Sequence, residues 1–361
     1  LVASAAHTYG RKIAGAEAFT GPPNRIFEAH PSALKSQGDY FLCQGINQFH
    51  LHTFTHDPYE KVPGLGLGAY GSRFDRRNTW WSFAQPWMNY IARCQYLLQQ
   101  GEFVADILYY AGEDAPKSAK AGKELTPPPP LGFDYDICNR EILDQVNVQE
   151  GCIILPSGMS YRMLVLPNKR HMRLEVLLKI EKLVTAGATV IGPKPSRIPG
   201  LEDGKNSEIQ LKKIADRLWH KCDGRSVTNN FYGKGQIYWG KSINDICNEL
   251  EIQPDFTFRV INDKVIKESK YPGTGLNYIH RKKDKTDIYF ISNQQDQFKI
   301  IKAKFRINHR LPELWDPESG RIEVAPEFQH SSDGRMIVTL QLEQSGSIFV
   351  IFREPLKNKK G

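Results

Sequence analysis

The stretch KIAGAEAFTGPP, residues 12–23, places a carboxylate, Glu17, near the end of a run of small and apolar residues. The run is typical of a buried strand, and Pro22 and Pro23 predict the loop that follows it. A buried carboxylate without a partner is energetically unfavourable. We therefore expect Glu17 to be paired, to bind a cation, or to lie at the mouth of a site where chemistry takes place.

Histidines in the segment FHLHTFTHDPY, residues 49–59, form a second set of candidates. His50 and His52 are two positions apart on a predicted strand, so their side chains are expected on the same face. Such a pair can bind zinc, with His56 or Asp57 as a further ligand. The alternative is that the histidines hydrogen-bond a substrate, or each other, at the end of the strand. The sequence contains no obvious second ligand cluster, which favours this alternative.

Two other motifs predict structure rather than chemistry. GLGAYG, residues 66–71, matches G-x-G-x-x-G, which indicates dinucleotide binding only between a strand and a helix. Here it follows the predicted loop YEKVPGL, and we expect a flexible loop. Cys152, in EGCIILPSG, lacks the small-residue turn of a nucleophile and is predicted to be a buried core thiol. The other five cysteines have no paired spacing and are also expected to be core thiols.

The composition suits a folded protein with more than one domain. The chain has 361 residues, 40% of them hydrophobic, and a formal net charge of +8, with Lys and Arg spread along its length. Its densest basic clusters, HRKKDK at 280–285 and the terminal KNKKG, are expected to be a turn and a tail, so nucleic acid is not an expected partner. No apolar run approaches the roughly 20 residues that a membrane span requires. The chain begins at Leu1, within a predicted helix, which predicts that further residues precede it.

Residues 1–101 are predicted to form a series of β/α units. Helices are expected at 1–10, 30–45 and 79–101 and strands at 13–19 and 46–54, an order that predicts a parallel sheet. We interpret this region as the C-terminal part of a (β/α)8 barrel, a fold of about 250 residues that has its chemistry at the C-terminal ends of its strands. Glu17 and His52 lie at such ends, and about 150 residues of the barrel would then lie upstream.

The rest of the chain predicts two further domains. Residues 102–255 contain the strands DILYY, MLVLP and TVIG, a helix at 175–186 that should pack on one face of their sheet, and a Pro-rich loop at 115–130. This pattern predicts a small doubly wound α/β domain. Residues 256–361 predict strands alone, including a hairpin with a charged turn at 276–293, and hence a β-sandwich domain.

Several short motifs, taken in their order, resemble a known family. ASAAHTYGRKIAGAEAFT, GINQFHLHTFTHDPY, RNTWW and YLLQQGEFVADILYYAGED, and later MLVLPN, LWDPESG and GSIFVIF, are similar to segments of the α-L-rhamnosidases of glycoside hydrolase family 106. The resemblance covers essentially the whole chain and the C-terminal portion of the family. It implies a catalytic barrel, a flavodoxin-like (amidotransferase-like) domain and β-sandwich modules in that order, here at 1–101, 102–255 and 256–361.

The resemblance implies hydrolysis of terminal α-L-rhamnosides of plant or microbial glycans with inversion, by two carboxylates and a calcium ion. Inversion requires an acid and a base about 6.5–9.5 Å apart, with a water molecule between them. Glu17 matches the family's AEAF glutamate and is expected to be a catalytic carboxylate or a calcium ligand. A further carboxylate is expected after the next strand, but Thr53 follows His52, and only Asp57 and Glu60 are nearby.

The same resemblance implies a rhamnose-containing oligo- or polysaccharide as the partner and a periplasmic or secreted location. The expected substrate-binding residues are His50, His52, His56, Asp57, Arg73, Trp80 and Trp81. Histidine and arginine would contact hydroxyl groups, and at least one tryptophan is expected to pack in the core instead of stacking on a sugar. Two alternatives stay open: a non-catalytic carbohydrate-binding relative, and a metal-dependent hydrolase that uses His50 and His52. By itself the chain is predicted not to be an active hydrolase, because most of the barrel would be missing.

Overall fold

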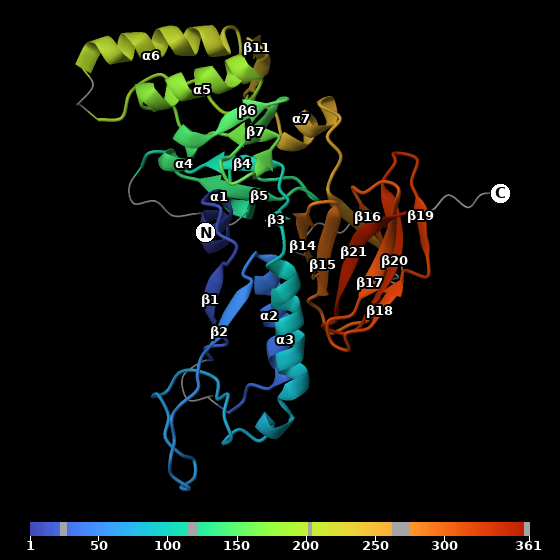
Figure 1. Cartoon of the computed structure of the whole chain (residues 1–361). Coiled ribbons are helices and arrows are strands. Elements are labelled where there is room, and N and C mark those ends of the chain that lie inside the picture. The colour runs from blue at the N-terminus through green and yellow to red at the C-terminus, as the bar shows by residue number, and fades with distance from the viewer. Residues whose placement is uncertain (22–26, 115–121, 201–203, 262–274, 357–361) are drawn as a thin grey trace, which may run out of the picture. The chain divides into compact units, whose positions relative to one another are not determined.

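The computed structural model describes residues 1–21, 27–114, 122–200, 204–261 and 275–356 (Figure 1). The chain has a mixed α/β fold with several sheets, as predicted at that level. Apart from the first two residues, the chain groups into two compact units, one of Ala3–Arg11 with Val104–Asp255 and the other of Lys12–Phe103 with Phe256–Gly361. Residues 12–103 and 256–361, which were predicted as parts of different domains, thus belong to one unit.

The first unit is built on a six-stranded sheet with the order β11-β12-β10-β9-β4-β5. Its strands are β4 (Ile107–Tyr110), β5 (Tyr135–Cys138), β9 (Met163–Val165), β10 (Thr189–Ile191), β11 (Asn229–Tyr232) and β12 (Gly235–Tyr238). All neighbouring pairs are parallel except β11 and β12. The predicted neighbours DILYY, MLVLP and TVIG are β4, β9 and β10, and every residue of these three strands is buried, as expected of parallel strands covered on both faces.

Helices surround this sheet. In the described part of the unit they are α1 (Val2–Thr8), η2 (Gly122–Glu124), α4 (Arg140–Gln145), α5 (Leu174–Ala186), α6 (Gly204–Trp219) and α7 (Ile243–Glu249). α5 is the helix predicted at 175–186, and its Val176, Ile180 and Val184, spaced four residues apart, are completely buried. Gly187, with a φ of 126°, follows its last residue and ends it. Among the described residues, no helix has the length and apolar character that crossing a membrane requires.

A smaller antiparallel sheet in the same unit contains Cys152. Its strands are β6 (Asn147–Gln149), β7 (Cys152–Ile154) and β8 (Ser160–Tyr161). Cys152 is half-buried, so the prediction of a buried thiol is wrong. The reason is the alternation of a strand: Ile153 faces the core, and Cys152 and Ile154 on either side of it face the other way. The five other cysteines are buried, and all six are free thiols.

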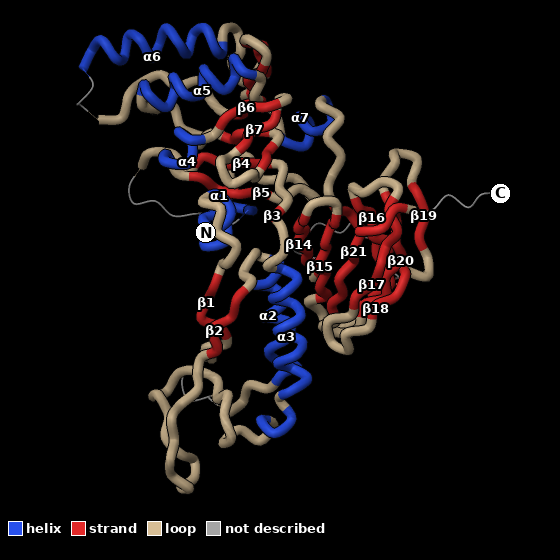
Figure 2. The backbone as a smooth tube through the Cα atoms, viewed as in Figure 1, coloured by secondary structure: helices blue, strands red, loops and turns tan. Residues whose placement is uncertain are grey.

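The second unit begins with two β/α units (Figure 2). β1 (Gly15–Ala18) and β2 (Gln48–Leu51) pair in parallel, and α2 (Pro31–Cys43) connects them. α3 (Gln85–Leu98) follows β2 after a long segment that contains the short helix η1 (Trp81–Phe83). The order of helices and strands is as predicted, but the helix predicted at 79–101 is shorter. Pro86 fits only the first turn of a helix, so it fixes where α3 starts.

Two antiparallel sheets complete the second unit, with the orders β13-β16-β20-β19 and β18-β17-β21-β15-β14-β3. The strands are β3 (Glu102–Phe103), β13 (Phe256–Val260), β14 (Leu276–Lys283), β15 (Thr286–Asn293), β16 (Lys299–Phe305), β17 (Arg310–Trp315), β18 (Ile322–Val324), β19 (Phe328–His330), β20 (Met336–Leu342) and β21 (Ser347–Pro355). One apolar core includes Tyr289 and Phe352 of the larger sheet and Phe256 and Phe305 of the smaller one. β14 and β15 form the predicted hairpin, and β3 joins the larger sheet through β14.

Candidate active site

Glu17 and His50 lie opposite each other on the neighbouring strands β1 and β2. In a parallel pair, residues in register point to the same face, because both strands alternate in phase. Both residues are exposed. The pair of strands therefore presents a carboxylate and an imidazole together on one open face. The prediction that Glu17 lies on a buried strand is wrong for this chain, since Ala18 is the buried residue of β1.

The glycine at position 15 makes room for the imidazole of His50. A Cβ at Gly15 would lie 3.0 Å from Nε2 of His50, so the ring lies directly against the glycine backbone. The same nitrogen is 3.4 Å from Nε2 of Gln48. The hydroxyl of Thr20 donates to Oε1 of Glu17 at 2.6 Å. Thus close packing positions the imidazole, and a hydrogen bond orients the carboxylate.

His52 directly follows β2, at the same end of the strands as Glu17. Its N–H donates to the carbonyl of Ala18 at 3.1 Å and its carbonyl accepts from the N–H of Ser72 at 2.9 Å. The side chain packs on Gly71, where a Cβ would lie only 2.6 Å from Nδ1 of His52. This nitrogen is buried and has no hydrogen-bond partner among the described residues. His52 therefore ties the end of β2 to residues 71–72, which lie on the segment before α3.

Asp57 is buried in the segment that follows β2. Nε of Arg77 donates to its Oδ2 at 2.8 Å, and the N–H of Tyr59 donates to its Oδ1 at 3.3 Å. The hydrogen bond from Arg77 lowers the pKa of Asp57 below its ordinary value, so the group stays ionised. This carboxylate holds the segment together and is poorly suited to exchanging a proton. His56, its neighbour in sequence, is exposed.

Arg73 is 2% exposed and belongs to the same segment. Its Nε donates to Oδ2 of Asp75 at 2.7 Å, and its Nη1 donates to the carbonyl of Leu65 at 2.7 Å. Its Nη2 is buried and has no hydrogen-bond partner among the residues that the structure describes. Arg73 therefore uses two of its three guanidinium nitrogens to hold the segment together.

Trp80 and Trp81 are half-buried, and their ring centroids lie 6.0 Å apart in an edge contact. Nε1 of Trp80 donates to the carbonyl of Ala29 at 2.8 Å, and its ring lies edge-on to Phe74. These contacts give Trp80 a packing role. Trp81 keeps part of its ring accessible.

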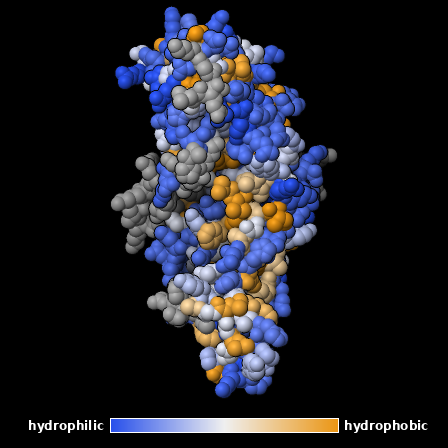
Figure 3. All heavy atoms as spheres, turned by 90° about the vertical axis from the view of Figure 1, so that its left-hand side faces the viewer, coloured by the Kyte–Doolittle hydropathy of each residue, from blue (hydrophilic) through white to orange (hydrophobic). Residues whose placement is uncertain are grey.

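Apolar side chains are exposed along the segment between β2 and α3. More than half of the surface is accessible at Phe54, Tyr59, Val62, Leu67 and Tyr70. Figure 3 shows apolar groups among polar ones on the face that it presents. A concentration of exposed apolar groups is typical of a surface that contacts another part of a protein or a ligand.

The chain is similar to known proteins along almost its whole length. A family model described as alpha-L-rhamnosidase, glycoside hydrolase family 106, matches residues 2–330. The chain belongs to this family. A rhamnosidase from Novosphingobium sp. PP1Y is 31% identical, and its structure matches 99% of this chain with a TM-score of 0.86. A Formosa agariphila protein named "Putative beta-glucuronidase" is 38% identical over 359 residues.

The match to more distant structures concerns the fold alone. A β-galactosidase from Bacillus circulans sp. alkalophilus matches 97% of this chain with a TM-score of 0.53 and 11% identity. The chain spans only part of its family relatives, 33% of the Novosphingobium chain and 28% of the Formosa protein. About two thirds or more of each relative therefore has no counterpart in this chain.

In this family member, the predicted site residues fall into separate groups. Glu17 and His50 share one face, and His52 lies at the end of the same pair of strands. Asp57 and Arg73 are each engaged in an ion pair, with Arg77 and Asp75 respectively. Asp75 and Arg77 were not among the residues predicted for the site. The alternating charges of RFDRR, residues 73–77, could have predicted that these side chains pair with nearby groups.

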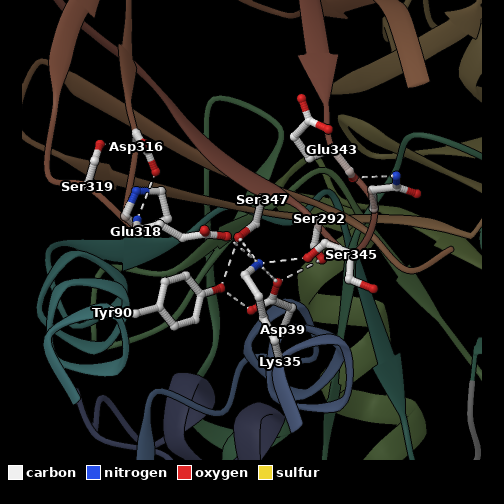
Figure 4. Close-up of polar contacts among 12 residues, drawn as sticks. Lys35, Asp39, Tyr90, Ser292, Asp316, Glu318, Ser319, Glu343, Ser345 and Ser347 are labelled. Carbon is white, nitrogen blue, oxygen red and sulfur yellow. Dashed lines mark hydrogen bonds and ion pairs between the residues drawn. The ribbon is translucent and has the colours of Figure 1, made fainter. Parts of the chain in front are cut away.

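A buried polar cluster that was not predicted from the sequence anchors α2, the helix between the two site strands (Figure 4). Asp39 of α2 is completely buried and accepts hydrogen bonds from Nζ of Lys35 at 2.9 Å, from the Tyr90 hydroxyl, and from the Ser292 hydroxyl at 3.2 Å. Lys35 also donates to the hydroxyl of Ser347 at 2.9 Å. Burial raises the pKa of Asp39, and the charge of Lys35 opposes that rise. The spacing of four residues between Lys35 and Asp39 was the available signal.

The residues present do not by themselves fit the calcium ion that the family implies. Calcium takes about six to eight oxygen ligands. At the candidate site the chain offers the Glu17 carboxylate and the Thr20 hydroxyl. In the described ranges, no group of three or more His, Cys, Asp or Glu residues is placed to hold a metal ion. The same finding gives no support to a zinc site built on His50 and His52.

Proposed function

We propose that the protein to which this chain belongs is a glycoside hydrolase that releases terminal α-L-rhamnose from plant or microbial glycans with inversion. The observation that carries the proposal is the open face on which Glu17 lies in register with His50. Membership of a rhamnosidase family and 31% identity to a rhamnosidase give this face its chemical interpretation.

In this proposal Glu17 supplies a carboxylate and His50 contacts a sugar hydroxyl. Inverting hydrolysis uses one carboxylic acid to protonate the leaving oxygen and one carboxylate to activate water on the opposite face of the sugar. Glu17 is accessible for either task or for binding a cation. Asp57 is an unsuitable second group because it is buried and its two oxygens accept hydrogen bonds from Arg77 and from the N–H of Tyr59. The second carboxylate would therefore come from the part of the longer protein that this chain lacks.

The proposal includes the finer domain assignments. Residues 1–101 would be the C-terminal part of a (β/α)8 barrel, 102–255 a flavodoxin-like (amidotransferase-like) domain, and 256–361 a β-sandwich. Supporting features are the parallel pairing of β1 and β2 through α2, the parallel sheet of the first unit, and two antiparallel sheets with one core. A barrel represented by so few strands would be open, so this chain alone is expected to be inactive.

Calcium is a further part of the proposal. Glu17 would contribute one carboxylate ligand, and the remaining oxygen ligands would come from outside this chain. Calcium-dependent thermal stabilisation of the full-length protein that is lost in Glu17→Gln would support this role.

The proposed partner is a rhamnose-containing oligo- or polysaccharide. Because such polymers lie outside the cytoplasm, we propose a periplasmic or secreted location. Cell fractionation of the native host would test the location directly.

Glu17→Gln in the full-length protein tests the proposed function. The amide has nearly the same shape but cannot act as a base, and it binds calcium less well. We expect a loss of about 10²-fold or more in the rate of rhamnose release from an aryl α-L-rhamnoside, with the fold retained. Glu327→Gln, which changes an exposed glutamate of the same unit, is the matched control and should keep full activity. Near-complete activity of Glu17→Gln would contradict the assignment.

A second candidate substrate is a β-glucuronide, because the 38% identical Formosa protein carries the name of a β-glucuronidase. Parallel assays with aryl α-L-rhamnoside and aryl β-D-glucuronide distinguish the two. Turnover of the glucuronide alone would favour the second candidate. Binding of rhamnosides with no turnover of either substrate would favour a non-catalytic carbohydrate-binding protein.

A further inference from the structure

The parallel sheet of the first unit has a point where the chain changes direction across it. β4 is the first of its parallel strands, and the chain next adds β5 on one side and then β9 on the other. From β9 it continues outward to β10 and β12. In open parallel sheets, ligands bind outside the carboxyl ends of the strands at such a switch point. Here that point lies between β4 and β9.

A small hollow occupies this place. Its lining comes from the residues that end and follow β4, among them Tyr110, Glu113 and Asp114, and from those that follow β9, among them Lys169 and His171. The two loops approach closely because position 112 is glycine. A Cβ there would lie 2.9 Å from Cγ of Pro167, and the φ of Gly112 is 84°.

Tyr110 contributes an unsatisfied hydroxyl to the lining. The residue is 4% exposed, and its Oη is buried with no hydrogen-bond partner among the described residues. Tyr109, which faces the other side of the sheet, donates its hydroxyl to the carbonyl of Pro127 at 2.8 Å. Buried hydroxyl groups normally have such a partner. An unsatisfied one in the wall of a hollow at a switch point is a group that a ligand hydroxyl can satisfy.

The charges around the hollow exclude most ionic ligands. Oδ1 of Asp114 lies 2.9 Å from Nε2 of His171, and its Oδ2 pairs with Lys169. Oε2 of Glu113 accepts the N–H of Arg173 at 2.8 Å. Two carboxylates in the lining repel phosphate or another anion. Lys169 opposes a cation, and the described residues hold no group of three metal ligands.

Neutral molecules with neighbouring hydroxyl groups satisfy this set of side chains. Each hydroxyl both donates and accepts, so one can donate to a carboxylate while another accepts from the ammonium group of Lys169. The phenol of Tyr110 is neutral, because burial raises its pKa above the ordinary value. It can therefore donate a hydrogen bond to either of two neighbouring ligand hydroxyl groups or accept one from it.

We propose that the hollow between the ends of β4 and β9 binds the hydroxyl-bearing edge of a neutral saccharide. Tyr110 hydrogen-bonds one sugar hydroxyl, and Lys169 and Asp114 contact its neighbours. This site is separate from the face of Glu17 and His50, and it goes beyond hydrolysis because binding there requires no reaction. Its role is to retain a glycan on the protein.

Saccharide titration of the 361-residue chain tests the proposal. The chain carries Glu17→Gln in every sample, so that binding at the proposed active site is reduced equally, and the probes are L-rhamnose and D-glucose. Saturation-transfer NMR and calorimetry should detect millimolar binding. Tyr110→Phe removes only the unsatisfied hydroxyl and should weaken binding about tenfold. Tyr109→Phe makes the same chemical change on the opposite face of the sheet and should leave binding unchanged.

Thermal unfolding of the same two variants separates a ligand role from a structural one. Tyr110→Phe should unfold at the same temperature as the parent chain or higher, because it removes an unsatisfied buried group. Tyr109→Phe should unfold at a lower temperature, because it breaks a formed hydrogen bond. Equal saccharide binding by Tyr110→Phe and the parent chain would overturn the proposal. So would binding of inorganic phosphate that Lys169→Gln abolishes, with no binding of either sugar.

Discussion

The carboxylate of Asp57 and the guanidinium of Arg77 form an ion pair across a loop of twenty residues, with Oδ2 and Nε 2.8 Å apart. Their side chains are only 5% and 13% exposed. Gly64, with a φ of 83°, packs so closely on the pair that a Cβ there would overlap Oδ2 of Asp57. The pair therefore closes the segment between β2 and α3 next to the candidate site.

Asp57→Asn should destabilise the chain in a pH-dependent way. The pKa of Asp57 is lowered in the folded protein, so the ion pair contributes stability above the ordinary carboxylate pKa of about 4. This contribution disappears as the pH falls through the lowered pKa of the folded state. Melting temperatures of the parent and Asp57→Asn should thus differ at pH 7 and converge in acid. Asp144→Asn, which breaks the more exposed pair with Arg140, should have a smaller effect.

Tyr90→Phe should weaken the buried cluster around Asp39. The lost hydroxyl hydrogen-bonds both Asp39 and Ser347, and a buried acceptor would be left with one partner fewer. We expect the free energy of unfolding to fall by about 1–3 kcal/mol, measured by urea denaturation. Tyr96 lies on the same helix but is 66% exposed, so Tyr96→Phe should leave the free energy of unfolding nearly unchanged. Equal losses in both variants would show that the cluster does not anchor α2.

Asp134→Asn should stabilise the chain progressively as the pH rises. Asp134 is half-buried, and partial removal of its carboxyl group from water, with Asp136 and Asp255 as secondary causes, raises its pKa to about 8. Below a pH of about 4, the pKa of this group in the unfolded chain, Asp134 is protonated in both the folded and the unfolded state. Asp134→Asn therefore has little stability advantage over the parent there. Between about 4 and 8 the unfolded state alone ionises, and the parent loses stability. The difference in melting temperature should grow across this range and then level off, whereas Asp216→Asn, at a largely exposed group, should show no such trend.

Gly15→Ala should displace the imidazole of His50. Its Cβ would meet Nε2 of His50 at 3.0 Å, closer than nearly all such contacts. We expect shifted His50 imidazole signals in NMR spectra of the chain and reduced rhamnoside hydrolysis by the full-length protein, with the fold retained. Gly21→Ala is the matched control, since a Cβ there would make an ordinary contact of 3.5 Å with Oγ of Ser72. Unchanged His50 signals in Gly15→Ala would show that the glycine does not position this ring.

The sequence was most informative where the information is local. Continuous apolar runs predicted the neighbouring strands β4, β9 and β10, and helical periodicity predicted the helix α5. Both patterns are local because they follow from which side chains of one segment are buried. Boundaries were less accurate. Pro86 lies inside the helix predicted at 79–101, and its preference for the first turn could have placed the start of α3 correctly.

Features that depend on distant residues could not be predicted. Glu17 lies opposite His50 and not opposite His52. This register is set by how the two strands pair and cannot be predicted from either strand alone. The burial of Asp39 depends on Ser292, 253 residues away along the chain. The expected burial of Glu17 failed because small residues on a strand do not reveal whether anything covers its outer face.

The discontinuity of the second unit has a consequence for synthesis on the ribosome. Lys35 donates to the carbonyl of Ser345, 310 residues later, so this unit cannot close until nearly the whole chain has emerged. At about 5–20 residues per second, the 310 residues from Lys35 to Ser345 take roughly 15–60 s to synthesise, and Lys35 waits that long for this partner. The unit formed mainly by residues 104–255 can fold during that interval, because all strands of its six-stranded sheet lie within these residues. Until then the buried face of α2 is unprotected, and chaperones that recognise exposed apolar helices have their longest opportunity to bind there.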